Sequence, residues 1–320
     1  MPDKLQVVFE DCQLEFETLS GLMRQSWAEN TEQPLIYSAD FLRSCFEYPG
    51  MRPDLAPVAM WKARPAGFVA GFPRTLSVCG QPGRFVLMTF FTVAPELKGK
   101  GVGTSLWAEC LRKAQSAGFG GALHYCVDGS ISNQATLAGA RSAGFEAKRI
   151  FTVPYLARIL KPLAEFEEPT EIPEAAHLFL VDAGRRIAAD LPIARLWSSE
   201  EAEWQLKRRH DRCVAWNPNG GLLSGCYMRV ADAEQTPCLF VDEIHWGELE
   251  AESRKALLGQ FLRAASQQAR LAVVPLLGYA DTKPLQEAGF RRSMRKLHAY
   301  LTCWQGSAPT VVNALYADVS

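Results

Sequence analysis

Residues 93–104 read VAPELKGKGVGT, and they indicate the fold of this chain more strongly than any other segment. It follows the apolar run FVLMTFFTV (85–93), which predicts a strand covered on both faces. It leads directly into a helix that we expect from Thr104 to about Ala117, where Gly118 ends it. A strand that turns through three glycines into a helix is typical of a phosphate-binding loop. A tight turn with solvated lysines explains this stretch equally well when it is taken alone.

The chemistry of the loop suits a diphosphate. Glycine allows backbone turns that a Cβ would block and lets a ligand come close to the amides. These amides, together with the unpaired N–H groups of the helix start, form an anion site. Lys98 and Lys100 add positive charge.

Elements on both sides of the loop predict an α/β (α+β) fold, with helices packed on a sheet. A hairpin is expected around the turn at Arg64–Gly67. The predicted helices and strands are Thr18–Glu29 (helix), Ser38–Phe46 (helix, Ser38 as N-cap), Val58–Trp61 (strand), Gly67–Phe72 (strand), Leu123–Val127 (strand), Asn133–Ala143 (helix) and Ile150–Arg158 (strand).

A similar order of elements returns after a segment rich in proline and acids, 161–174, which is typical of a linker. LAGARSAGFEAKRIFTVPYL (137–156) resembles KPLQEAGFRRSMRKLHAYL (283–301), and in each a helix ends in Ala-Gly-Phe before a strand. This repeat indicates an internal duplication. We therefore expect two domains, 1–160 and 175–320, that pack as one rigid unit. The elements predicted in the second are Ser199–Arg209 (helix), Cys213–Trp216 (strand), Leu222–Val230 (strand), Cys238–Trp246 (strand), Glu250–Gln268 (helix) and Leu271–Leu277 (strand).

Composition limits the partners and the compartment. With 320 residues and a net charge of −1, the chain offers no field for nucleic acid or an anionic membrane. No run reaches the ~20 apolar residues that span a bilayer, and the first residues, MPDKLQVVFEDC, do not resemble a secretory signal. Nine cysteines without CxxC spacing predict reduced thiols in the cytoplasm, and five histidines without ligand spacing predict no metal site.

The loop resembles the first signature of the GNAT superfamily of acetyl-coenzyme-A-dependent N-acyltransferases. In that family a strand ends Val-x-Pro, and Arg/Gln-x-x-Gly-x-Gly/Ala then opens a helix. Here Val93 and Pro95 precede Lys98, Gly101 and Gly103, with Lys in place of Arg/Gln. A second signature, Asn followed by a helix ending Gly-Phe, is similar to 133–145. The resemblance covers about residues 5–158 well and 175–303 weakly.

The resemblance implies tandem GNAT-like domains, each a mostly antiparallel mixed sheet with a central splay, and an acyl-coenzyme A co-substrate. The pantetheine arm is expected between two splayed strands, bonded to the backbone at Phe91 and Val93, with Asn133 touching the arm. The pyrophosphate is expected at Lys98, Gly99, Lys100, Gly101, Val102, Gly103 and Thr104. The implied reaction is acyl transfer to a primary amine of a small molecule or peptide, by a monomer or homodimer.

The family's usual acid and base positions carry other residues here. The helix tyrosine is replaced by Ala140, beside Gly139, which predicts an open surface, and the carboxylate of the central strand is replaced by Thr89. Tyr125 and His124 are candidate catalytic residues, although only one can face the gap, and core packing explains both equally well. Water or the incoming amine is an alternative proton source. The segment that usually walls the acceptor pocket carries Asp40, Glu47 and Tyr48, which a solvated helix face also explains.

The second half lacks the loop. Aligning the two Ala-Gly-Phe triplets puts Trp246 in the place of Val93, and an acidic segment, 247–252, follows without Gly-x-Gly. Acids at a helix start repel phosphate, so we expect coenzyme A in the first half only. Asp242, Glu243 and His245 are a relict site, a selector for a cationic acceptor, or a solvated strand end.

Three functions stay open at this stage. The first is the N-acyltransferase. The alternative is a catalytically weak acyl-coenzyme-A-binding module with a sensing or structural role, which the missing acid and base favour. The third is an acyltransferase with a longer donor or a non-amine acceptor, which the aromatic side chains of Phe85, Phe90 and Phe91 would tolerate.

Overall fold

The strands of the chain join in one mixed sheet. The computed structural model describes residues 7–11, 15–27, 35–127, 129–162, 172–209, 211–230, 232, 234–304 and 309–319. Thirteen strands of this part form the sheet in the order β1-β3-β4-β5-β6-β13-β7-β12-β11-β10-β2, with β8 added to β4 and β9 to β10. The strands are β1 (Val8–Asp11), β2 (Leu35–Ile36), β3 (Pro57–Trp61), β4 (Arg64–Val78), β5 (Gln81–Val93), β6 (Gly121–Cys126), β7 (Ala147–Ile159), β8 (Ile193–Leu196), β9 (Arg212–Asn217), β10 (Gly221–Val230), β11 (Pro237–His245), β12 (Leu271–Pro275) and β13 (Arg291–Cys303).

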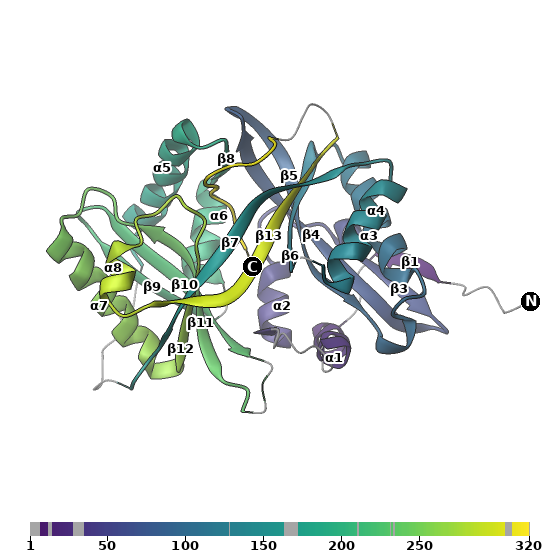
Figure 1. Cartoon of the computed structure of the whole chain (residues 1–320), viewed down its shortest axis with the longest axis horizontal. Helices are drawn as coiled ribbons and strands as arrows, with labels where there is room; N and C mark the ends of the chain where they lie inside the picture. Colours follow the sequence, from purple (N-terminus) through teal and green to yellow (C-terminus); the bar gives the residue numbers. More distant parts are fainter. Residues whose placement is uncertain are drawn as a thin grey trace, which may run out of the picture.

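Helices cover both faces of this sheet (Figure 1). They are α1 (Phe16–Trp27), α2 (Ala39–Phe46), α3 (Val102–Ser116), α4 (Ile131–Ser142), α5 (Glu174–Asp190), α6 (Ser199–Glu203), α7 (Ala251–Gln268) and α8 (Lys283–Glu287). Short 3-10 turns lie at Pro53–Leu55 and Pro95–Leu97, and a π-helical turn, Trp204–Arg208, continues α6.

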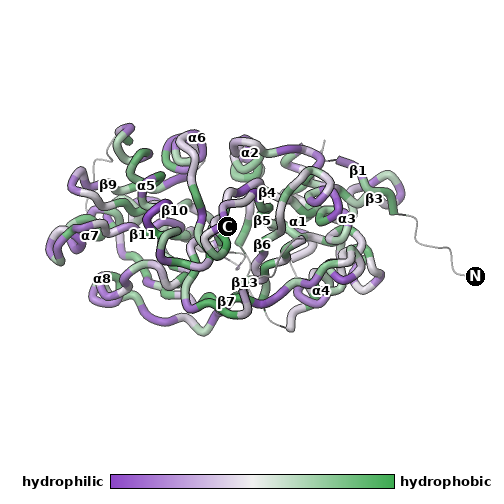
Figure 2. Tube along the Cα trace, turned by 90° about the horizontal axis from the view of Figure 1, so that it is seen from above, coloured by the Kyte–Doolittle hydropathy of each residue, from purple (hydrophilic) through white to green (hydrophobic). Residues whose placement is uncertain are grey.

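In the first half, side chains alternate between two cores. Phe68 and Phe72 of β4 join the core under α1 and α2, whereas Val69 joins the core under α3. This is the alternation expected of strands covered on both faces. The second half is built in the same way, with α7 over one core and α5 and α6 over another. The hydropathy trace shows these apolar strands running through the interior, beneath more polar helices (Figure 2).

The two halves exchange their last strands. β13, from the second half, lies between β6 and β7 and pairs antiparallel with both. β7, from the first half, lies between β13 and β12 and pairs through residues 155–159 with β12. Figure 1 shows the two long strands crossing the centre of the molecule together. The division into domains 1–160 and 175–320 stays a prediction.

Most predicted elements are confirmed, with shifts of a few residues at their ends. Ser38 caps α2 as predicted, because its Oγ accepts the amide of Phe41 at 3.1 Å. The predicted hairpin turn at 64–67 is wrong. The turn lies at Lys62 and Ala63, whose φ values of 50° and 58° are those of a two-residue turn that matches the twist of the strands. Neither residue type signals such a turn. Residues 28–29 of the first helix and 163–171 of the linker lie outside the described residues.

Within the described ranges, no helix is long and apolar enough to cross a membrane. The described cysteines are free thiols, most of them buried.

Candidate functional site

The two central strands of the first half separate, as the family resemblance implied. β5 and β6 run parallel and pair from Phe85 to Met88 against 121–124, and their pairing ends there. Beyond that point β6 keeps its other partner, because Tyr125 still lies opposite Ala299 of β13. The edge of β5 from Thr89 to Val93 therefore faces a gap.

A β-bulge in β5 accompanies the separation. Its register against β4 shifts between Thr89 and Thr92, and Phe90 has a φ of 59°. A non-glycine residue with positive φ is uncommon and is held in place by its surroundings. The bulge reverses the side-chain alternation, so that Phe90 packs toward α2 and Phe91 packs on Trp107 of α3.

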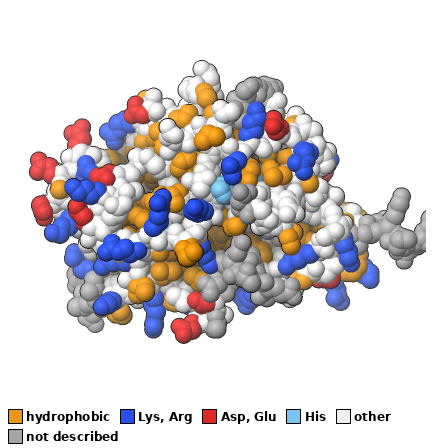
Figure 3. All heavy atoms as spheres, viewed as in Figure 1, with side chains coloured by type: hydrophobic (Ala, Val, Ile, Leu, Met, Phe, Trp, Pro, Cys, Tyr) orange, Lys and Arg blue, Asp and Glu red, His pale blue; other side chains and the backbone are white. Residues whose placement is uncertain are grey.

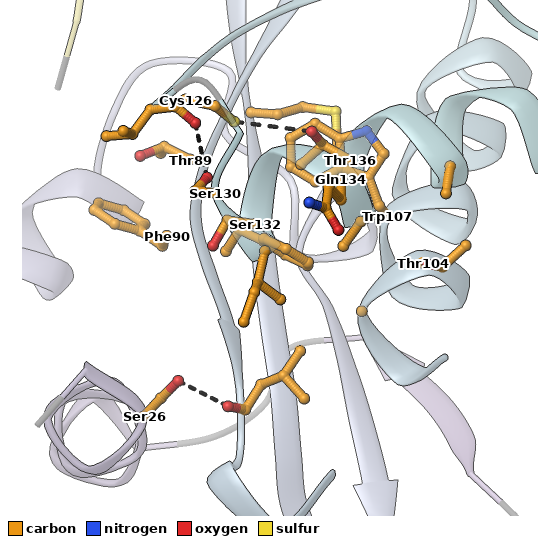
Figure 4. A pocket seen from close by; sticks show the side chains of 18 of the residues that line it. Ser26, Thr89, Phe90, Thr104, Trp107, Cys126, Ser130, Ser132, Gln134 and Thr136 are labelled. Atoms are coloured by element: carbon orange, nitrogen blue, oxygen red, sulfur yellow. Dashed lines mark hydrogen bonds between the residues drawn. The ribbon is translucent and has the colours of Figure 1, made fainter. Parts of the chain in front are cut away.

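The gap opens into a cleft of about 910 Å³. α3 and α4 form one wall, with Thr104, Trp107, Ser132 and Gln134, and Thr89 and Phe90 lie opposite (Figure 4). The full lining is Ser26, Trp27, Leu87, Met88, Thr89, Phe90, Phe91, Val93, Leu97, Lys98, Gly99, Gly101, Gly103, Thr104, Trp107, Tyr125, Cys126, Val127, Ser130, Ile131, Ser132, Gln134, Ala135, Thr136, Ala138, Leu297 and Val319. Ser26, Trp107 and Val319 carry no sequence signal for this role, because only the folded chain brings them to the gap.

The glycine loop presents open backbone at one end of the cleft. Gly99 and Gly101 have φ values of 75° and 81°, and a Cβ on either would meet no atom within 4 Å. α3 begins at Val102, and Ser105 donates its first hydrogen bond, to the carbonyl of Gly101 at 3.1 Å. The N–H groups of residues 102–104 precede that bond, as at every helix start. This end therefore has the open amides and the dipole that an anion needs.

Gly103 is required for a different reason. A Cβ there would lie 2.8 Å from Phe91 Cζ and 3.2 Å from Val93 Cγ2. Its φ is not positive, so the constraint is one of space between α3 and the edge of β5. Any larger residue must push Phe91 or extend into the cleft.

Lys98 ties the loop to the end of α1. Its Nζ donates to the carbonyl of Ser26 at 2.6 Å, and Ser26 Oγ donates to the carbonyl of Val93 at 2.7 Å. An ammonium group at a helix C-terminus is favourably placed against the helix dipole. Lys98 thus has a partner within the chain, while Lys100 is exposed.

Tyr125 and His124 point to opposite faces of β6. Tyr125 lines the cleft, and its hydroxyl is buried without a hydrogen-bond partner among the described residues. Burial, followed by the charges of Asp318 and Tyr155, raises the pKa of Tyr125 well above its usual value, so the hydroxyl stays protonated. His124 is 1% exposed and stacks on Tyr300 with ring centroids 5.1 Å apart. Burial lowers the pKa of His124 to about 3, so this ring is neutral and packs in the core.

Asn133 and Gly139 of α4 turn toward the protein. Asn133 is 3% exposed, and its Nδ2 donates to the hydroxyl of Tyr300 at 3.2 Å, while its neighbours Ser132 and Gln134 line the cleft. The open surface expected at Gly139 is wrong, because a Cβ there would lie 2.8 Å from the carbonyl oxygen of Thr104. The glycine lets α4 approach α3 closely, and Ala140 beside it is fully buried.

Aromatic rings close the cleft behind Thr89. Phe90 meets Tyr37 and Phe72 edge to face, with centroid distances of 5.0 and 5.7 Å. Past Leu87, Thr89 and Phe90 lies a cavity of about 20 Å³, which also touches Asp318. That space holds roughly one water molecule.

Asp40 and Tyr48 on the acceptor side, and Asp242, Glu243 and His245 in the second half, have partners within the chain. Asp40 pairs with Arg43 on the surface, and the buried Tyr48 accepts from Arg195 Nη2 at 2.9 Å. Asp242 pairs with Arg209 and accepts from Ser224 Oγ at 2.7 Å. Hydrogen bonds join Glu243, His245 and Tyr316 to one another. Asp242, Glu243 and His245 therefore lie in buried networks and are not a solvated strand end. Glu47 is exposed.

Charge also differs between the two halves. Asp and Glu side chains gather at the end of the molecule that carries α7, and Lys and Arg side chains lie toward the centre of the face shown (Figure 3). α7 begins directly after the acidic segment, with Glu250 as its N-cap and Glu252 in its first turn. Within the described residues, no group of three or more His, Cys, Asp or Glu side chains could hold a metal ion.

Comparisons with known proteins agree with this geometry. Residues 20–145 match the model of the Acetyltransferase (GNAT) family. The fold is similar to that of Saccharomyces cerevisiae N-myristoyltransferase with bound myristoyl-CoA, with a TM-score of 0.70 and 13% identity over 96% of this chain and 82% of that chain. It is also similar to a putative acetyltransferase from Pyrococcus horikoshii, with a TM-score of 0.54 and 12% identity over 97% of this chain and 94% of that one.

A third similar structure is the GCN5-related N-acetyltransferase from Kribbella flavida, with a TM-score of 0.54 and 15% identity over 92% of this chain and 70% of that one. No curated protein sequence matches the chain significantly. At these identities the structural matches establish the fold, which is the two-lobe arrangement of N-myristoyltransferase.

Proposed function

We propose that this chain, which carries a GNAT acetyltransferase domain at residues 20–145 within a two-lobe fold, transfers an acyl group from acyl-coenzyme A to a primary amine. One observation carries the proposal. The edge of β5 leaves β6 at Thr89 and leads through an open glycine loop to the start of α3, along a single cleft. The acceptor is a small molecule or a peptide.

The residues present fit an acyl-coenzyme A. The loop at 99–104 offers amides and a helix start to the pyrophosphate. The edge of β5 that faces the gap near Phe91 and Val93 offers hydrogen bonds to an amide-containing arm, except at the Val93 carbonyl, which accepts from Ser26 Oγ. The indole N–H of Trp107 and the hydroxyl of Tyr125 are buried without partners among the described residues, and both side chains line the cleft. Such orphaned groups favour a polar ligand. When bound, the donor supplies an acyl group activated as a thioester.

The chain's own residues then have three tasks. The loop and the β5 edge position the acyl carbon, and positioning alone accounts for a large part of catalysis in two-substrate reactions. Backbone N–H groups near Val93 polarise the acyl carbonyl. The neutral amine nitrogen bonds to the acyl carbon, and the carbon–sulfur bond breaks. The nitrogen loses a proton to water, and the departing sulfur takes a proton from a donor that water then reprotonates. Tyr125 holds a proton at its Oη in the cleft and is our candidate donor for that step.

A second candidate function is an acyl-coenzyme-A-binding module with a sensing or structural role. The fully buried Ala140 and the hydroxyl of Thr89, at positions where related enzymes carry an acid and a base, favour it. Without such groups a rate loss of about 10²–10⁴-fold is expected unless another residue replaces them.

Release of free thiol from acetyl-coenzyme A, with and without a panel of primary amines, tests the proposal. We expect amine-dependent release that disappears in Gly103→Glu. Calorimetry with coenzyme A is expected to give one site per chain under both candidate functions, so thiol release is the measurement that separates them. Tight binding with no release for any amine or acyl donor would favour the binding module. Absence of binding would refute both.

A further inference from the structure

The second half contains a strand gap like the one that forms the cleft. β11 and β12 run parallel and pair from Cys238 to Phe240 against 271–273, and their pairing ends there. β11 then has a bulge against β10, as β5 has against β4. In the alignment of the two repeats, Ile244 takes the place of Phe91. Its amide therefore corresponds to one that we expect to bind the cofactor arm in the first half.

The chain itself fills this second gap. Tyr279, in the segment after β12, accepts the amide hydrogen of Ile244 with its hydroxyl at 3.1 Å. Trp246 Nε1 donates to the carbonyl of Asp281, in the same segment, at 2.7 Å. The Tyr279 hydroxyl and the Asp281 carbonyl thus accept hydrogen bonds from Ile244 and Trp246. An amide-containing ligand in the gap would otherwise accept them. Burial raises the pKa of Tyr279 well above its usual value, so the hydroxyl stays neutral.

The segment of residues 277–281, which fills the second gap, also contacts residues 312–319 through its backbone. Leu315 donates its amide to the carbonyl of Leu277 at 2.8 Å. Gly278, with a φ of 85°, bridges to Leu315, and a Cβ on it would lie 2.9 Å from that of Ala314. The two segments are in backbone contact, so displacement of one displaces the other.

Tyr316 connects residues 312–319 to Glu243 of β11. Its ring lies 4.8 Å from that of Tyr279, and its hydroxyl donates to Glu243 at 2.8 Å. Trp197 Nε1 donates to the same hydroxyl at 2.6 Å. The side chains of Trp197, Glu243 and Tyr316 are buried, where polar contacts are strong and costly to leave unmade.

This segment, residues 312–319, reaches the cleft of the first half. Asp318 pairs with Arg74 of β4 and Arg195 of β8 and touches the small cavity behind Thr89. Val319 lines the cleft itself. Residues 316–319 therefore join the closed gap of one half to the open gap of the other.

We infer that the second strand gap, closed by Tyr279, serves as an anchor that positions residues 316–319 against the donor cleft, and that Tyr279 and Tyr316 are positioning residues. The inference rests on the proposed function for its effect on turnover, but its structural part can be measured without turnover. It gives Glu243 a task, as the acceptor that fixes Tyr316, and it explains why one coenzyme A is expected per chain.

The test compares Tyr279→Phe and Tyr316→Phe with the matched control Tyr227→Phe. Tyr227 is also a buried tyrosine of the second half, but its hydroxyl donates to the carbonyl of Ala264 at 3.4 Å, under α7 and away from residues 312–319. Amide hydrogen exchange is measured at residues 312–319 and 98–104. Calorimetry gives the dissociation constant of coenzyme A, and thiol release gives kcat.

We expect faster exchange at 312–319 in both variants. The increase should be tenfold or more in Tyr316→Phe, which loses a hydrogen bond to the Glu243 carboxyl group, and severalfold in Tyr279→Phe, which loses one to a neutral backbone amide. Exchange at 98–104 and coenzyme A affinity should stay within about twofold, while kcat falls about tenfold. The control should change none of these. Unchanged exchange at 312–319 would overturn the inference. A loss of coenzyme A affinity as large as the loss of kcat would also overturn it. Faster exchange at 312–319 in a protein that turns over no donor would support the anchor and refute the proposed function.

Discussion

Gly103→Glu tests whether a diphosphate lies where the glycine loop meets α3. A side chain at this position would collide with Phe91 and Val93, since a Cβ alone comes within 2.8 and 3.2 Å of them. It must therefore extend into the cleft, beside the amides that we assign to the pyrophosphate. The substitution combines two effects, bulk and charge, and Gly103→Gln supplies the first without the second.

The two effects differ in size. Overfilling a packed site costs about 1–3 kcal/mol, so Gly103→Gln should weaken coenzyme A binding about tenfold, at 1.4 kcal/mol per factor of ten. A carboxylate about 5 Å from a phosphate adds roughly 3 kcal/mol of repulsion per charge pair at an effective dielectric constant near 20. Gly103→Glu should therefore bind about 1,000-fold more weakly than the unchanged protein.

Calorimetry with coenzyme A at about 0.05 M and about 0.5 M salt measures both terms, because the Debye length shrinks several-fold between these conditions. The difference between Glu and Gln should narrow at the higher salt concentration. Equal melting temperatures of the two variants serve as the control for folding. Equal losses of affinity for Gln and Glu at both salt concentrations would show that no phosphate lies at this helix start.

Four further predictions follow from the site and its support. Tyr125→Phe should lower kcat by about 100-fold or more at every pH. Neither the parent nor the variant should show a falling alkaline limb in its pH–rate profile, because the Tyr125 hydroxyl stays protonated. An unchanged kcat would exclude Tyr125 as the proton donor. Phe90→Ala should extend the donor range to longer acyl chains, measured by thiol release from acetyl- to hexanoyl-coenzyme A. Phe72→Ala, equally buried at 4% but outside the cleft lining, should lose similar stability and keep the donor preference. A fragment of residues 1–160 should be poorly soluble, because it lacks the strand that pairs with β6 and β7; a soluble fragment that binds coenzyme A would contradict this. Asp318→Asn should cost about 3–5 kcal/mol at neutral pH, as expected for breaking a buried ion pair. Burial alone would raise the Asp318 pKa, but Arg195 and Arg74 outweigh it and lower the pKa. The pair therefore stabilises the fold above about pH 4 and loses this effect as pH falls through the native pKa, so the melting curves of variant and parent should converge in acid.

The sequence predicted the features that local chemistry controls. The glycine loop, the strand before it and the helix after it are confirmed, since positive φ at Gly99 and Gly101 and the helix start follow from residue type. The gap between β5 and β6 was expected from the family resemblance and is present. The cap at Ser38 was read correctly for the same local reason.

Features set by partners distant in sequence were not predictable. The repeats 137–156 and 283–301 are alike, so nothing in them shows which half of the sheet their last strands join. The inward turn of Asn133 depends on Tyr300, which arrives only with the exchanged strand β13. The tie between Lys98 and the carbonyl of Ser26 likewise depends on where α1 ends in space. In each case the deciding contact lies far along the chain.

The strand exchange has a consequence for the order of events during synthesis. β6 cannot complete its hydrogen bonding until β13, which ends at Cys303, has left the ribosome. At about 5–20 residues per second, the interval between the emergence of β7 and that of β13 is about 7–30 s. During that time the nascent first half exposes an unpaired apolar strand edge, which is prone to intermolecular pairing. We therefore expect folding to be post-translational in its last step, limited by long-range strand insertion, and yield in cells to depend on chaperones that shield this edge.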